Sequence, residues 1–200
     1  MRFECARGVL LAATSLLLAV PALAEDGNAE RGGKLAYTCM GCHGIENYKN
    51  AYPKYSVPKL GGQSAIFIAA ALAEYKAGAR WHPTMKGMAS TLSAQDHADL
   101  AAWFQGPRRA QPGAKPAGTL PAAAAPCTAC HGQNGIGTMP ENPTLAGQHA
   151  DYLAQALNDY RRGKRQNPIM GSFASGLSPD DIQAIAAYFA QQQGLATPGR

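Results

Sequence analysis

Apolar residues recur at helical spacing in two long segments of the chain. In residues 65–77 they fall three or four positions apart, and Gly78 interrupts the pattern. In residues 150–162 the same spacing returns, and Gly163 follows it. This spacing places the apolar side chains on one side of an α-helix, and glycine commonly ends helices, so each segment is predicted to be an amphipathic helix.

Two later segments carry the residues that typically begin a helix. Ser93 has Asp96 three positions further on, which is the spacing of a capping box. Ser178 and Asp181 repeat this spacing, and Pro179 stands at the first helical position, where the missing N–H of proline costs nothing. Each half of the chain is therefore predicted to contain a further helix.

The connecting residues 79–92 and 164–177 show neither helical nor strand spacing, and we expect irregular loops there. No other stretch alternates apolar and polar residues in the way that a half-buried strand does. The predicted fold class is therefore all-α.

The chain contains one unit written twice. Residues 57–80 match residues 142–165 at an offset of 85, and the match continues through the helix that follows in each half. The sequences CMGCHG at 39–44 and CTACHG at 127–132 correspond at an offset of 88, so the first unit holds three extra residues. Two copies of so long a repeat indicate a duplicated domain rather than a solenoid.

Composition sets the boundaries of the two domains. The segment 106–120 is rich in proline, glycine and basic residues and has no apolar periodicity, so we assign it as a linker. It separates an N-terminal domain at 25–105 from a C-terminal domain at 121–200. Each domain is small and rich in alanine, and a domain of this size usually needs a disulfide, metal or cofactor for stability.

The first 24 residues have the pattern of a secretory signal peptide. Arg2 and Arg7 precede a short apolar run, and small residues at Ala22 and Ala24 form a cleavage site. After Ala24 no stretch approaches the roughly 20 apolar residues that a membrane-spanning helix needs. Cleavage after Ala24 predicts an exported, periplasmic chain without a transmembrane segment, which is compatible with a peripheral association with membranes.

The charge of the chain is mildly basic. The formal net charge is +5, and loss of Arg2, Arg7 and Glu4 with the signal peptide lowers it to +4. A nucleic-acid-binding domain would carry a stripe or patch of clustered basic residues, so no nucleic-acid partner is expected.

The four cysteines that remain after cleavage all lie in the two repeated motifs. In an exported chain the motif C-x-x-C-H is the attachment site of a c-type haem. Sulfurs three positions apart lie on one side of a helical turn and reach the two vinyl groups of one porphyrin, and the next histidine lies under the ring. The candidate haem-binding residues are Cys39, Cys42 and His43 in the first unit and Cys127, Cys130 and His131 in the second.

Two other kinds of site use paired cysteines. A thioredoxin-type disulfide accompanies an alternation of strands and helices, and none is predicted here. In a zinc site the two C-x-x-C pairs normally lie 15–20 residues apart, whereas these are offset by 88. The sequence therefore predicts two covalently bound haem c groups.

The sixth iron ligand is expected in the residues after the long helix of each unit. Met85 corresponds to Met170 in the repeat, and each lies two positions after a proline. Met88 and His82, the other candidates in the first unit, correspond to residues of a different type. Met85 and Met170 are therefore predicted as axial ligands, which would raise the reduction potential of both haems.

Together these features resemble cytochrome c4, a family of tandem dihaem class I cytochromes c. The resemblance extends over nearly all of residues 26–191. Besides the two haem motifs and the methionines, it rests on repeated segments of pattern P-x-L-x-G-Q and Y-x-x-G-x-R, found at 58–63, 143–148, 75–80 and 160–165.

The resemblance implies a fold, a function and further roles for residues. It implies two class I cytochrome c domains, each wrapped around one haem and related by a pseudo-twofold axis. The carbonyl groups of Pro58 and Pro143 would accept hydrogen bonds from the iron-ligating histidines. Arg80 and Arg165 are candidate partners for haem propionates, and solvation past a helix end is the alternative for both.

The two units differ at their beginnings. The first has an opening helix in which Gly33 and Tyr37 are expected to face the last helix of the unit. The second has only residues 119–126 before its motif, enough for a turn or two. His97 and His149 correspond to other residue types in the opposite unit and are expected at the surface.

Three classes of function remain open at this point. The resemblance favours a monomeric carrier, not an enzyme, that takes electrons from quinol–cytochrome c reductase and gives them to a terminal oxidase. The second class is an electron-accepting subunit of a periplasmic flavoprotein or quinoprotein dehydrogenase. The third is an enzyme acting on peroxide or thiosulfate, which would need one open iron position. Lys49, Lys54 and Lys59 follow the first haem motif and are hypothesised to face an acidic partner.

Overall fold

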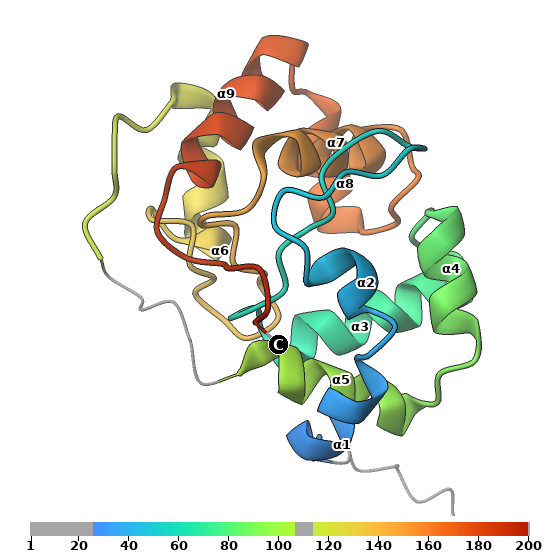
Figure 1. The fold of residues 1–200 in the computed structure, drawn as a ribbon. Helices are drawn as coiled ribbons and strands as arrows, with labels where there is room; N and C mark the ends of the chain where they lie inside the picture. The colour runs from blue at the N-terminus through green and yellow to red at the C-terminus, as the bar shows by residue number, and fades with distance from the viewer. Residues whose placement is uncertain (1–25, 107–113, 200) are drawn as a thin grey trace, which may run out of the picture.

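The computed structural model describes residues 26–106 and 114–199, and its regular elements are all helical (Figure 1). The signal-peptide prediction lies outside these residues. The first half contains α1 (Ala29–Leu35), α2 (Met40–His43), α3 (Ala65–Ala77), α4 (Pro83–Ser90) and α5 (Ala94–Gln105). The second contains the 3₁₀ helix η1 (Ala122–Cys127), α6 (Thr128–His131), α7 (Ala150–Arg161), α8 (Pro168–Ser175) and α9 (Pro179–Ala190).

Helices α3, α5, α7 and α9 confirm the four predicted helices. The amphipathic pattern is confirmed for α7 but is wrong for α3, whose apolar residues are spread around the helix and whose Ile66 is 51% exposed. Gly78 ends α3 in the left-handed conformation, at φ 83°. Both predicted capping boxes are present, with Ser93 and Asp96 at the start of α5 and Ser178 and Asp181 at the start of α9. The predicted all-α class is confirmed, since the described residues contain only isolated bridges and no strand.

The prediction of irregular loops at 79–92 and 164–177 is wrong, because each segment contains an eight-residue helix. Proline opens both α4 and α8. The side chains of His82 and Asn167 accept hydrogen bonds from the amides of Met85 and Met170 at 3.3 and 3.0 Å. Each of these short helices buries a single alanine, so their apolar spacing gave no signal.

Helix α1 crosses α5 at two small residues. Gly32 is buried against the main chain of Asp99, where a Cβ atom would clash with the Asp99 carbonyl. Ala36 is fully buried one turn later. The expected pair is therefore shifted by one position: Gly33 still contacts Trp103, but Tyr37 is 83% exposed and takes no part in the crossing.

The second domain replaces this opening helix with shorter structure, as predicted. Ala124 of η1 is fully buried in the core formed with α7 and α9. Residues 114–120, which were predicted to belong to the linker, are held at Ala117 just past the end of α9. There the Gln192 side chain accepts a hydrogen bond from the Ala117 amide and donates one to its carbonyl.

The expectation for His97 is also wrong. His97 is only 6% exposed, because it packs on the inner side of α5. His149 is half-buried at the start of α7.

Two reciprocal clasps join the domains around a pseudo-twofold axis. The Gln63 side chain donates to the Thr144 carbonyl and accepts from the Thr144 amide, both at 2.9 Å. The Gln148 side chain makes the same pair of bonds with Lys59, at 3.0 and 2.9 Å. At an offset of 85 these two clasps are equivalent, and so are the two main-chain bonds that flank the bridge between Arg80 and Arg165.

The segment after α9 returns to the first domain (Figure 1). The Leu195 amide donates to the carbonyl of Ala146, and Ala196 exchanges two main-chain hydrogen bonds of 3.0 Å with Gly61. Since Gly61 and Ala146 are equivalent in the repeat, one segment contacts the same point of both domains. Within the described part of the chain, no helix is long and apolar enough to cross a bilayer.

Candidate haem sites

A large apolar cleft lies in the first domain, facing the second. Its empty space is about 1050 Å³, counting the open mouth. Helix α2 brings Cys42 and His43 to it, helix α4 brings Met85, and helices α3 and α5 supply most of the apolar wall. The cleft therefore gathers the residues that the sequence singled out in the first unit.

Both motif histidines are held in the same way. The Nδ1 atoms of His43 and His131 lie 2.9 Å from the carbonyl oxygens of Pro58 and Pro143, which confirms the contacts implied by the resemblance. A carbonyl only accepts, so Nδ1 carries the proton and Nε2 keeps a free lone pair. Burial lowers the pKa of both imidazoles and favours this neutral form. A neutral, oriented imidazole is the form that binds a metal.

The motif cysteines are neither paired nor assembled into a metal site. All four are free, and Cys130 is exposed. Burial raises the pKa of Cys39 and Cys127, so these thiols are protonated at neutral pH. Among the described residues no group of three His, Cys, Asp or Glu side chains could hold a metal, which removes the zinc alternative. The thiols therefore remain available for thioether bonds.

Helix α4 brings two methionines to the cleft, since Met85 and Met88 both line it. They differ in position: Met85 is the third residue of α4, as Met170 is of α8, and its amide is bonded to the capping side chain. His82 also lines the cleft, but its Nδ1 accepts this amide hydrogen bond. Met85 and Met170 therefore occupy equivalent positions, whereas His82 serves as the N-cap of α4.

Two buried arginines meet at the domain interface beside the cleft, and one of them, Arg80, lines it. Arg80 and Arg165 are only 2% and 6% exposed, so neither is simply solvated. Arg80 Nε and Nη1 have no hydrogen-bond acceptor, although the Glu74 carboxylate lies 3.5 Å from Nη1. A buried cation with unsatisfied donor atoms is costly, and it indicates that an anionic group belongs there.

These features fit a haem. The lining of the cleft is mostly apolar, and it includes the two motif thiols, the oriented imidazole of His43 and the thioether of Met85. The unsatisfied guanidinium of Arg80 matches the propionate carboxylates that a haem carries. When bound, the haem iron takes up and releases one electron, and the protein sets the potential through ligands, hydrogen bonds and burial.

The arginines meet at one tyrosine that sequence reasoning missed. Tyr152, on α7 of the second domain, accepts hydrogen bonds from Arg80 at 3.1 Å and from Arg165 at 3.3 Å. Burial alone would raise the pKa of Tyr152, but the two cations and their hydrogen bonds lower it to about 8. The available signal was a mismatch in the repeat, because the equivalent residue in the first unit is Phe67.

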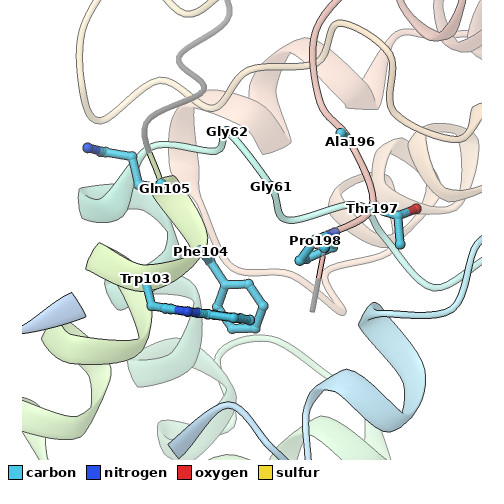
Figure 2. Close-up of a pocket in the computed structure, with 10 residues that line it drawn as sticks. Gly61, Gly62, Trp103, Phe104, Gln105, Ala196, Thr197 and Pro198 are labelled. Atoms are coloured by element: carbon cyan, nitrogen blue, oxygen red, sulfur yellow. The ribbon is translucent and has the colours of Figure 1, made fainter. Parts of the chain in front are cut away.

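A second cavity lies behind the first cleft, and it lacks such chemistry (Figure 2). Its empty space is about 670 Å³, and it separates Trp103 and Phe104 of α5 from the segment 196–198. Phe104 lines both cavities and packs edge-on against the His43 ring, with centroids 6.4 Å apart. This cavity contains no titratable side chain and is not a candidate for cofactor binding.

The basic loop of the first domain contacts the second domain. Lys49 lies 3.2 Å from the Asp151 carboxylate, which also accepts hydrogen bonds from the amide and hydroxyl of Ser56. Lys59 donates from Nζ to the Gly147 carbonyl at 2.7 Å. Lys49 and Lys59 therefore contact the second domain, although the Lys49 side chain is still 58% exposed, and Lys54 is exposed. The hypothesis that these lysines face an acidic partner stays a prediction.

Comparison with known proteins matches both halves of the chain to one family. The cytochrome c family matches residues 29–106 and again 120–193. The chain is 36% identical to cytochrome c4 of Pseudomonas aeruginosa, over 93% of this chain and 98% of that protein. It is 34% identical to the thiosulfate dehydrogenase electron acceptor of Stutzerimonas stutzeri, over 90% and 93% respectively. The structure of reduced recombinant cytochrome c4 from Pseudomonas stutzeri superposes with a TM-score of 0.66 and 32% identity, over 84% of this chain and all of that one.

Proposed function

This chain belongs to the cytochrome c family, as a dihaem electron-transfer protein similar to cytochrome c4, and on that premise we propose that it is a periplasmic electron carrier. Its donor would be a quinol–cytochrome c reductase and its acceptor a terminal oxidase. The observation that carries this proposal is the symmetry of the two sites. Each domain has one histidine oriented by a proline carbonyl, and one methionine in the first turn of a helix whose amide is bonded to the N-cap side chain. Hydrogen bonds between the domains hold the two sites together.

We further propose the role of each residue at the two haems. Cys39 and Cys42, and likewise Cys127 and Cys130, form the thioether links. His43 and His131 bind iron through Nε2, because Nδ1 is held by a proline carbonyl. Met85 and Met170 are the opposite ligands, and a thioether favours ferrous iron and a high potential. Iron with both axial positions filled relays electrons and has no open position for a substrate, so the protein is not itself an enzyme.

Arg80 and Arg165 would bind the haem propionates at the seam. Both guanidiniums are buried at the contact between the domains, and Arg80 has two nitrogen atoms without an acceptor. Carboxylates in this position would remove the cost of burying two cations side by side.

A second candidate function is favoured by one similarity. The thiosulfate dehydrogenase electron acceptor has nearly the same identity and coverage as cytochrome c4, and its name describes service to one dehydrogenase. In that case the chain would accept electrons from a periplasmic dehydrogenase rather than from the quinol-oxidising complex.

Stopped-flow reduction of the purified dihaem protein distinguishes the two functions. We expect rapid reduction by quinol–cytochrome c reductase and rapid reoxidation by terminal oxidase, with rates that fall as salt screens the encounter. Slow reduction by the reductase together with fast reduction by thiosulfate dehydrogenase would favour the alternative. Gel filtration followed at the haem absorption band should give the size of a monomer, and recovery in a stable complex would also favour the alternative.

A further inference from the structure

One residue of the second domain lies in the haem cleft of the first. Tyr152 belongs to α7, yet it lines the cleft together with His43, Met85 and Arg80. Asp151, the residue before it, is held across the interface by Ser56 and Lys49. The position of Tyr152 in the neighbouring cleft is therefore fixed by contacts between the domains.

The hydrogen bonds of the Tyr152 hydroxyl leave its own proton without a partner. The oxygen accepts from one guanidinium nitrogen of Arg80 and one of Arg165. Arginine has no acceptor, so neither residue can take the phenolic hydrogen. Within the described residues, no hydrogen bond has this hydroxyl as its donor. A buried O–H group without an acceptor is unfavourable, which indicates that an acceptor absent from the polypeptide belongs beside it.

Two neighbouring cations make this hydroxyl a stronger donor. Guanidiniums at 3.1 and 3.3 Å withdraw electron density from the oxygen, which is the physical origin of the lowered pKa of Tyr152. A polarised donor of this kind suits an anionic acceptor. The expected acceptor is therefore a carboxylate. A haem bound in this cleft would supply one as a propionate.

The repeat makes this donor unique to one side of the interface. The residue equivalent to Tyr152 in the first domain is Phe67, whose ring lies under Arg80 at 5.5 Å and carries no hydroxyl. The second haem therefore receives no matching donor from the first domain, although each domain stacks its own arginine on two aromatic rings.

We propose that the Tyr152 hydroxyl donates a hydrogen bond across the domain interface to a propionate of the first haem, and that this contact distinguishes the two haem environments. The inference rests on the proposed haem site at His43. A donor beside a carboxylate offsets negative charge near the iron, and reduction, which adds an electron, becomes easier. Tyr152 is thus a positioning residue that raises the potential of the first haem relative to the second.

The test is the change of Tyr152 to Phe in the dihaem protein. Each haem is followed by its own methyl resonances in NMR, assigned to a domain through contacts with Phe104 or Phe189, during a redox titration. We expect the equilibrium for electron sharing between the haems to move at least threefold toward the second, which is about 30 mV for a one-electron couple. The first haem should account for most of this shift.

Two further variants are matched controls. Tyr160→Phe removes a hydroxyl from a ring that also stacks on Arg165, without a hydrogen bond to either arginine, and should leave the equilibrium within its error. Phe67→Tyr supplies the missing donor on the other side and should move the equilibrium toward the second haem. Resonance Raman spectra provide an independent readout, because Tyr152→Phe should alter the propionate bending mode of one haem only.

Equal shifts of both haems, or no shift, would overturn the inference. The native protein provides a separate check of the premise, since two haem c groups per chain and two one-electron steps are required by the proposed function. If both are found and Tyr152→Phe moves neither potential, the role of Tyr152 is refuted and the function stands.

Discussion

The two domains share a haem-binding unit but close it differently. In the first, α1 packs across α5 at Gly32, and the Asn28 amide and Arg31 side chain both bond to the buried Asp99 carboxylate. In the second, the 3₁₀ helix η1 packs against α9 through Ala124, and Ala117 bonds to Gln192 just past the end of α9. Residue 184, the counterpart of Asp99, is an alanine, so no carboxylate is buried there.

The comparison separates features that both haem sites share from features in which the two domains differ. The proposed iron ligands coincide in both domains: the histidine bonded to a proline carbonyl, and the methionine at the third position of a capped helix. The parts that cover the unit diverge in length and in chemistry. Duplication thus left the proposed iron ligands equal, while the coverings and the Tyr152–Phe67 pair became specific to each domain.

Changing one methionine at a time is the strongest test of equal iron ligation in the two domains. Replacing Met85 or Met170 by Ala should each halve the sulfur-to-iron charge-transfer absorption of the oxidised protein and lower the potential of one haem. Met88→Leu is the matched control, because Met88 lines the same cleft from another position on α4, and the absorption should persist. Loss of half the absorption in the Met88 variant would contradict the assignment.

The packing of α1 against α5 can be disrupted by adding a single methyl group. Gly32→Ala places a Cβ atom against the carbonyl of Asp99 and should destabilise the first domain by about 3 kcal/mol, since neither backbone can move easily. Gly41→Ala, on α2 with open space around it, should change stability by less than about 1 kcal/mol. Hydrogen exchange measured residue by residue would separate the domains, and equal loss of protection in both would be evidence against independent closures.

The equivalence of the two clasps predicts equal effects from two distant changes. Gln63→Ala and Gln148→Ala each leave a main-chain N–H and C=O of the other domain without partners, at a cost of about 2 kcal/mol apiece. Chemical unfolding followed at the haem band would measure both. If the two losses of unfolding free energy differ by more than about 1 kcal/mol, the two clasps do not contribute equally to stability.

The smallest effect concerns the buried carboxylate of the first domain. Hydrogen bonds from the Asn28 amide and Arg31 hold the pKa of Asp99 below its ordinary value. The stabilisation is therefore present above the unfolded-state pKa of about 3.9 and is lost as pH falls through the lower folded-state pKa. Asp99→Asn should lower the melting temperature at pH 7 and make no difference in strong acid. Asp180→Asn, at an exposed site on α9, should have little effect at either pH.

Much of each haem unit was predictable because its signals are local. The capping boxes, the glycine stop after α3 and the spacing of the motif cysteines all act within a few residues. The short helices α4 and α8 were missed because they are stabilised by a proline at their start and a capping side chain, while only Ala89 and Ala174 are buried.

The seam between the domains was harder to predict from the sequence. Arg80 and Arg165 follow helix ends, where arginines are usually solvated, and each lies buried where it meets the other domain. The interdomain contacts of Lys49 and Lys59 were not predicted because the partner of each, Asp151 and Gly147, lies about 90 to 100 residues away in the chain. A repeat identifies equivalent positions, but it does not reveal which of them meet at the axis.

The segment after α9 makes the two domains unequal in the order in which they can follow each other along the chain. A duplication copies each unit with the residues that trail it. Among the residues that the structure describes, the trailing segment that bonds to the equivalent points Ala146 and Gly61 is that of the second unit, through Leu195 and Ala196. The corresponding stretch of the first unit, from Gly106, leads into the connection between the units instead. Recombination that exchanged the order of the two units would place this trailing segment in the connection and leave the meeting point bare. The order of the units in the gene is thereby part of the structure.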